Sequence, residues 1–224
     1  MMERRIRVTG RATVEAPADI AVVRLDIEGI EGTYEGAIRR CAENGKDIKD
    51  RLEAVGLDRD SLKTVSQNVQ PHSIEVRVGK DAYDRWITEK RRDGFEYTNT
   101  LRFEFPHDNG VLGRIMTSVL QSPCQPSVTI LFRSSDAESA RAKALGLATE
   151  DARAKAEVIS RSLGCSLGQV IDVSYESRSR YYDEREFLSA DCNKVALMGS
   201  CLDMDVDPED HSFSEEVTAV WTIE

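Results

Sequence analysis

The segment that decides the fold is residues 135–164, SDAESARAKALGLATEDARAKAEVISRSLG. Its small and apolar residues recur every three or four positions and form one row: Ala140, Ala144, Ala148, Ala152, Ala156, Ile159 and Leu163. Residues at this spacing share one face of an α-helix, so the row predicts a continuous stripe along a long helix. Because alanine side chains are short, we expect the backbone of this helix to lie close against a sheet.

Both ends of this helix carry sequence signals. Ser135 and Glu138 have the spacing of a capping box, in which each side chain accepts a backbone N–H at the start of the helix. Gly164 is expected to end the helix, because glycine adopts the left-handed conformation of a C-terminal residue without steric cost.

The rest of the chain alternates between strand and helix patterns. Polar and apolar residues alternate in the segments that we expect to form strands: 6–15, 21–28, 61–70, 95–105, 128–132, 170–175 and 217–223. The first two flank the turn Ala16-Pro17-Ala18-Asp19 and are expected to pair as an antiparallel hairpin. Residues 33–56 predict a second long helix, and Asp108 is expected to cap a short one. The expected inner face of the second long helix comprises Tyr34, Ile38, Cys41, Gly45, Ile48, Leu52 and Val55.

These elements predict an α+β fold, with an antiparallel or mixed sheet backed by two long helices and a short one. We expect a single domain over residues 1–224. A helix, a glycine stop and a strand follow one another in residues 33–70 and again in residues 136–175, which indicates a weak internal duplication.

Two segments differ from this framework. Residues 72–93 first alternate and then place many charges around Trp86, which predicts an exposed excursion or a protruding charged hairpin. Residues 176–212 are polar and least periodic, so we expect an insert that is either a long functional loop or partly mobile.

Composition excludes several classes of function. The 224-residue chain has 40 acidic and 30 basic residues and a formal net charge of -10, which argues against nucleic acid as the main partner. No apolar run approaches the roughly 20 residues that span a bilayer. The basic start of the chain is not followed by an apolar segment of signal-peptide type, so a cytoplasmic location is expected. The five cysteines include no CxxC and suggest reduced thiols.

Metal chemistry has two candidates, and both are weaker than the structural alternatives. Cys192, Cys201 and His211 are potential zinc ligands with a fourth ligand such as Cys165, but their spacing matches no compact zinc module. A disulfide under oxidising conditions and simple free thiols each explain these cysteines better than a zinc site. The run 203–207, DMDVD, resembles the start of a calcium loop, but the glycine and glutamate that this loop requires are replaced by Pro208 and Ser214. We therefore expect a solvated strand edge and no metal.

Catalytic motifs are also missing from the sequence. It has no Gly-x-Ser-x-Gly elbow, no Walker loop and no GxGxxG, so neither catalytic nor cofactor-binding residues are expected. His72, His107 and His211 lie in polar contexts that suit exposed loops.

Several short motifs together resemble the SIMPL domain (DUF541) family. They are IRVTG at residues 6–10, APADIA at 16–21, Gly94-Phe95, the alanine-rich helix around 148–156 and VTAVW at 217–221. The resemblance covers residues 5–223 and implies an α+β fold with a sheet backed by long helices and no accepted catalytic residues. The family includes exported bacterial proteins, among them a Brucella periplasmic immunogen of similar layout that assembles into a ring-like oligomer. This chain departs from the family in its start, which lacks a signal peptide, and in the insert 176–212.

The excursion is the strongest functional candidate. Tyr83, Arg85, Trp86 and Arg91 combine aromatic rings with arginines, as interface residues often do, although Trp86 packing back onto the sheet is an equal alternative. We therefore expect a non-enzymatic protein that forms homo-oligomers and acts as a scaffold or protein-interaction module. The alternative is an enzyme or small-molecule binder that uses residues 176–212 as a lid.

Overall fold

The computed structural model describes residues 4–80, 83, 85–177 and 205–224. Its contacts divide the chain into two compact units. Unit 1 comprises the described residues of Met1–Ile20, Phe132–Glu186 and Asp207–Glu224, and unit 2 comprises those of Ala21–Leu131 and Phe187–Val206. The chain passes between the units more than once, so neither is a continuous segment.

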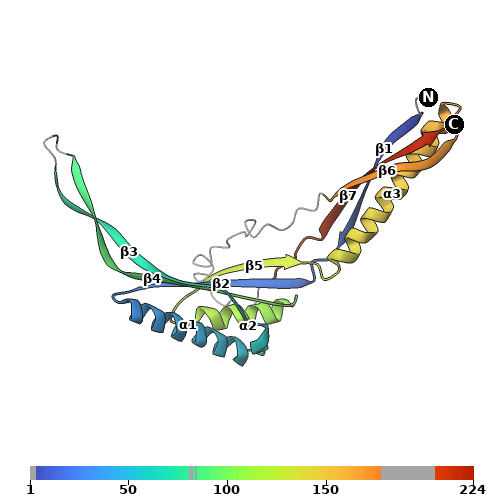
Figure 1. Ribbon diagram of the computed structural model, residues 1–224. Helices are drawn as coiled ribbons and strands as arrows, with labels where there is room; N and C mark the ends of the chain where they lie inside the picture. Colours follow the sequence, from blue (N-terminus) through green and yellow to red (C-terminus); the bar gives the residue numbers. More distant parts are fainter. Residues whose placement is uncertain (1–3, 81–82, 84, 178–204) are drawn as a thin grey trace. The chain divides into compact units, whose positions relative to one another are not determined.

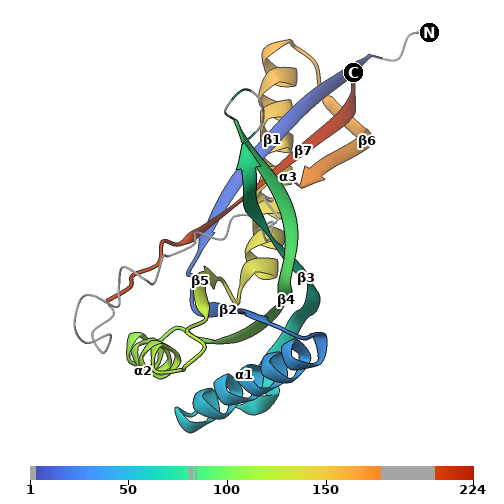
Figure 2. The ribbon, with the colours of Figure 1, turned by 90° about the vertical axis from the view of Figure 1, so that its left-hand side faces the viewer.

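Unit 1 is a three-stranded antiparallel sheet with a helix on one face. The strands are β1 (Arg5–Ala16), β7 (His211–Ile223) and β6 (Leu167–Ser177), in the order β1-β7-β6. Helix α3 (Ala137–Ser162) lies along β1 and β7, as Figure 2 shows. Ala152 and Ala156 pack there against Val8, Ala219 and Trp221.

The predicted alanine stripe is confirmed. Its members are at most 6% exposed: Ala140, Ala144, Ala148, Ala152 and Ala156. The strand under the stripe carries Gly10, which is buried. A Cβ atom at Gly10 would lie 2.8 Å from the Ala152 Cα and nearer still to the Ala148 carbonyl oxygen and the Ala152 nitrogen. The helix backbone therefore rests on the strand backbone, which is the close approach that the stripe predicts.

The predicted ends of α3 are partly wrong. Gly164 has the expected left-handed conformation, with φ of +72°. At the other end the N-cap residue is Asp136, without a side-chain cap, because Ser135 bonds elsewhere. The Ser135 nitrogen and hydroxyl donate to the Asp19 carboxylate at 2.7 and 2.6 Å. In the last turns the buried stripe continues at Ser160, whereas Ile159 and Leu163 are 41% and 67% exposed.

The Asp19–Ser135 bonds predict a stability that depends on pH. Both hydrogen bonds lower the pKa of the Asp19 carboxyl, the hydroxyl bond most strongly. A lowered pKa in the folded state stabilises the fold at pH values above the pKa of the unfolded chain, which is about 3.9. This contribution disappears as the pH falls through the pKa of the folded state. We expect the stability difference between the wild type and Asp19→Asn to be constant above about pH 5 and to shrink towards pH 2. Urea unfolding at each pH measures this difference, and a gap that widens on acidification would contradict the assignment.

Unit 2 is a four-stranded sheet with two helices on one face, as Figure 1 shows. The strands, in the order β3-β4-β2-β5, are β3 (Lys63–Lys80), β4 (Trp86–Pro106), β2 (Ile20–Glu31) and β5 (Ser127–Arg133). The helices are α1 (Tyr34–Ala54) and α2 (Asn109–Leu120), and a short 3₁₀ turn, η1 (Arg59–Ser61), precedes β3. The largest fully buried side chains in this unit include Leu25, Ile48, Leu101, Phe103 and Ile115.

Local sequence signals explain both helices of unit 2. The Thr33 hydroxyl accepts from Gly36 N at 3.1 Å, and the Asp108 carboxylate accepts from Val111 N at 2.8 Å. Gly56, with φ of +98°, follows the end of α1 as expected. The predicted inner face of α1 is correct from Cys41 to Leu52 but wrong at its start. Tyr34 and Ile38 are exposed, and Ala37 takes the buried place.

The predicted hairpin of the first two strands is wrong. β1 pairs with β7, and β2 lies in the other sheet beside β4 and β5. A tight hairpin needs residues that adopt positive φ, typically Asn or Gly. Pro17, between the two strands, is instead fixed at negative φ. The predicted α+β class is nevertheless confirmed, with the helices distributed over two sheets.

Candidate functional site

The predicted excursion is the far part of the β3–β4 hairpin, which protrudes from the helix-covered part of unit 2 (Figure 1). We call residues 72–92 the arm. Its strands pair from His72 opposite Gly94 to Lys80 opposite Trp86. Two register shifts, between His72 and Ser73 and between Arg77 and Gly79, interrupt the ladder. Residues paired directly opposite one another share a face of a ribbon, so the register assigns the side chains to two faces.

One face of the arm is apolar. It carries Ile74 and Val78 from β3 and Ile87 from β4, which are 43%, 56% and 47% exposed, and the half-buried Val76 lies between the first two. The same face also carries one acidic and one basic residue, because Glu89 pairs with Val76 and Arg91 pairs with Ile74. We call this surface the apolar face of the arm.

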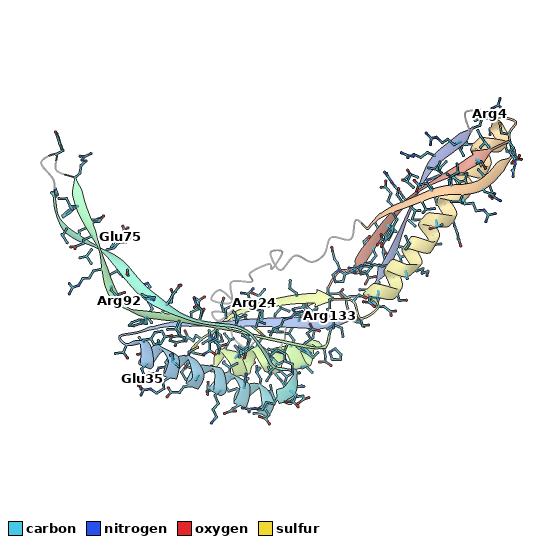
Figure 3. All side chains as sticks on the ribbon, in the orientation of Figure 1. Arg4, Arg24, Glu35, Glu75, Arg92 and Arg133 are labelled. Carbon is cyan, nitrogen blue, oxygen red and sulfur yellow. The ribbon has the colours of Figure 1, made fainter. Side chains whose placement is uncertain are left out.

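The opposite face is aromatic and basic. The Trp86 ring lies 5.1 Å from the Arg77 guanidinium carbon and 5.1 Å from the Lys80 nitrogen, which are distances typical of cation–π contacts. Figure 3 labels Glu75 and Arg92, which the register places on the same face. Trp86 remains 55% exposed despite both contacts.

The four predicted contact residues do not form one cluster. Tyr83 lies in the turn, and the Arg85 guanidinium carbon is 5.4 Å from its ring centre. Trp86 begins β4 on the aromatic face, whereas Arg91 lies on the apolar face. The sequence thus located the arm but not the division of its residues between two faces.

Unit 1 contains a groove that the sequence analysis missed. It has a volume of about 440 Å³ and runs between α3 and β6. Its apolar part includes Val170 and Val173 from β6 and Val217, Ala219 and Trp221 from β7. Arg153 and Glu157 of α3 form the polar wall and pair with each other at 3.0 Å. The sequence shows the alternation of residues 170–175 and so predicts the strand. It does not show that α3 leaves this strand uncovered.

The predicted zinc ligands cannot be brought together from the described residues. Cys192 and Cys201 lie outside them. His211 begins β7, and its Nε2 atom lies 3.0 Å from the Phe132 carbonyl oxygen. Within residues 4–80, 83, 85–177 and 205–224, no three His, Cys, Asp or Glu residues are arranged to hold a metal ion.

The histidines correct another expectation. His72 and His211 are strand residues rather than loop residues, and the His72 Nδ1 atom lies 2.7 Å from an Asp93 carboxylate oxygen. His107 precedes α2, and its Nε2 atom is 3.1 Å from the Val206 carbonyl oxygen.

Among the described residues of unit 2, the Cys41 thiol is buried and the Cys124 thiol is partly buried. Burial raises the pKa of both Cys41 and Cys124, although the hydrogen bonds of Cys41 with Gln67 and of Cys124 with Ser122 act in the opposite direction. Burial likewise raises the pKa of the Tyr97 phenol, whose oxygen accepts from Asn44 Nδ2 at 2.8 Å. A nucleophilic thiol needs a lowered pKa, so neither cysteine has the electrostatics of a nucleophile.

The polar insert begins and ends inside strands. Residues 176–177 complete β6 and residues 211–212 begin β7, while residues 178–204 lie outside the described part of the chain. The run 205–210 has no regular secondary structure, and Asn109 Oδ1 accepts from Val206 N at 3.3 Å. None of the helices in the described residues is long and apolar enough to cross a membrane.

Comparison with known proteins identifies a family but no function. Two solved structures of B. subtilis GlnK, one of them a GlnK-ATP complex, each share 11% sequence identity with this chain. Each match covers 52% of this chain and 86% of the GlnK chain with a TM-score of 0.32. No curated protein matches the chain. The family model SIMPL, described as a protein of unknown function (DUF541), matches residues 6–221 and spans both units. The chain therefore belongs to the SIMPL (DUF541) family.

Proposed function

We propose that this protein is a self-associating scaffold and that the arm is its association element. The observation that supports this proposal best is the apolar face of the arm, where Ile74, Val78 and Ile87 are about half exposed on a two-stranded ribbon. A ribbon of two strands is only marginally stable in water by itself. A partner that covers the apolar face would stabilise the arm and remove this surface from water.

The arm also has the composition of a protein contact. Trp, Tyr and Arg are the residues that most often dominate binding energy at interfaces. Tyr83, Arg85, Trp86 and Arg91 are all exposed, and we propose that they contact the partner. A homo-oligomer is the simplest assembly that places the same arm on every copy.

Three expectations from the sequence stay predictions. The alternative of an enzyme or small-molecule binder depends on a lid at residues 176–212, most of which lies outside the described residues. The cytoplasmic location is the second of these predictions, and the third, the exclusion of nucleic acid, rests on the composition of the chain.

Replacing Trp86 with alanine tests the arm directly. Loss of a large aromatic side chain at a contact typically costs about 2 kcal/mol of binding, so we expect the dissociation constant of the oligomer to rise about 30-fold. Sedimentation velocity over a range of concentrations measures this change. Val158→Ala is the matched control, because Val158 is 60% exposed on α3, outside the arm. If the oligomers of both variants have the dissociation constant of the wild type, Trp86 makes no contact and the arm loses this role.

A further inference from the structure

Helix α3 covers only part of one face of the three-stranded sheet of unit 1. α3 lies over β1 and β7 and has few contacts with β6, which is the last strand of the sheet. Val170, Val173 and Tyr175 are therefore 55%, 57% and 58% exposed. Pairing of Val173 with Ala219 and of Tyr175 with Val217 places them on the side of the sheet that faces the helix. They extend the apolar floor of the groove to the edge of the sheet.

The two edges of this sheet differ. At β1 the Asp151 carboxylate of α3 accepts from Arg11 N at 2.9 Å, so the helix satisfies part of this edge. At β6 no further strand is paired within the described residues. Exposed strand edges are sites at which other chains bind. The groove is therefore open on the side of the β6 edge.

We propose that the apolar face of the arm of one copy docks into the groove beside β6 of a second copy. This inference rests on the proposed function, because it names the surface that the arm contacts. The arm supplies a narrow extended ribbon with branched aliphatic side chains, and the groove supplies an apolar floor of Val170, Val173, Val217 and Trp221. Each surface leaves apolar area exposed, and each would cover the other.

The charges beside the two apolar surfaces are complementary. Glu89 and Arg91 are two residues apart on a strand, a separation of about 6.6 Å. Arg153 and Glu157 are four residues apart on α3, a separation of about 6 Å along the helix axis. Because the Arg153 and Glu157 side chains pair with each other at 3.0 Å, docking in one direction exchanges this ion pair for contacts of Glu89 with Arg153 and of Arg91 with Glu157. The opposite direction brings like charges together, so the charges also select the orientation.

The contact joins two different surfaces of the same chain. An interface of this heterologous kind leaves one arm and one groove unoccupied in every dimer, so further copies add until a ring closes or a filament grows. An arm that bound the arm of another copy would instead form a closed dimer.

Mixing two variants tests the inference. Val78→Glu places a charge on the apolar face of the arm, and Val173→Glu places one in the groove; both positions are more than half exposed, so folding should survive. We expect each variant alone to have the light-scattering mass of one 25.1 kDa chain. A 1:1 mixture is expected to give twice this mass and no more, because one intact arm meets one intact groove.

Matched controls separate docking from folding. Val65→Glu makes the same change on β3 outside the arm, at a position that is 54% exposed, and Ser174→Glu lies on the other face of β6, opposite Thr218. Both controls should keep the wild-type mass. Circular dichroism should show all four variants folded.

Charge reversal provides an independent readout. Arg91→Glu is expected to weaken the oligomer at least 10-fold, and Glu157→Arg in the same chain is expected to restore most of this loss. An absence of restoration would overturn the proposed pairing.

The outcomes distinguish this inference from the proposed function. A monomeric wild type would contradict both the proposed self-association and the docking of the arm into the groove. A second outcome is a wild-type oligomer that Val78→Glu dissociates and Val173→Glu leaves intact. The proposed scaffold function then stands, and docking of the arm into the groove is overturned, with a contact between two arms as the remaining arrangement. If both variants dissociate but their mixture stays at the mass of one chain, docking between arm and groove is also overturned.

Discussion

Replacing Gly10 with alanine is expected to destabilise unit 1 by about 3 kcal/mol or more, because overpacking costs 1–3 kcal/mol even where side chains can move. Here the obstacle is backbone. The new Cβ would overlap the Ala148 carbonyl oxygen and the Ala152 nitrogen, so neither can rotate away. α3 would have to lift from β1 along the alanine stripe. A loss of this size is a large fraction of the 5–15 kcal/mol that is typical of a domain.

Gly146→Ala is the control for this prediction. Gly146 is exposed on α3, and a Cβ atom there meets nothing within 4 Å. Alanine in a helix interior is about 1 kcal/mol more favourable than glycine, so we expect a gain in stability. Urea unfolding followed by circular dichroism compares the two variants. If Gly10→Ala unfolded at the wild-type midpoint, α3 would not lie on β1 as described.

The second large effect is expected at the base of the arm. Gly94 is buried opposite His72, and a Cβ atom there would lie 2.6 Å from the Glu31 carbonyl oxygen and 3.1 Å from Ile30 Cγ2. Gly94→Ala must separate β4 from the end of β2, which we expect to cost about 2–3 kcal/mol. Because the arm continues from this point, its direction should also change and the oligomer should weaken.

Gly79→Ala is the control in the same hairpin. A Cβ atom at Gly79 has open space around it, and a residue other than glycine is favoured inside a strand. We expect no loss of stability from this change. Hydrogen exchange of the β3 and β4 amides locates the effect of Gly94→Ala, and equal protection in the two variants would show that β4 tolerates a side chain at its base.

The sequence predicts the α3 stripe well because one physical rule controls it. From Ala140 to Ala156 the spacing of small residues alone identifies the buried face. The rule fails beyond Ala156. There the buried row continues in steps of four to Ser160, whereas Ile159 and Leu163 lie off this row and are 41% and 67% exposed. Because the residue at the buried position is polar, a search for small and apolar residues moves to the wrong side of the helix.

Strand pairing was predicted less well than strand existence. Alternation identified β1 and β7, but their partnership links the two ends of the chain, with Arg5 opposite Thr222. Sequential strands usually pair, which favoured a hairpin of β1 with β2. Pro17 is a local signal against a tight hairpin, but no local pattern identifies β7 as the partner of β1.

The candidate surfaces show the same limit. Trp86 and its charged neighbours identified the arm from composition alone. The faces of the arm depend on the register shifts near Ser73 and Gly79, which alternation does not show. The groove depends on α3 leaving β6 uncovered. A pattern of apolar residues in 170–175 predicted a strand but not that it would be exposed.

The solution mass of the unmodified chain shows whether the protein self-associates at all. Size-exclusion chromatography with light scattering, repeated over a hundredfold range of concentration, gives this mass without a label. Self-association through the arm predicts a discrete multiple of 25.1 kDa that persists on dilution. A mass of one chain at every concentration would contradict self-association, and with it the role of the arm.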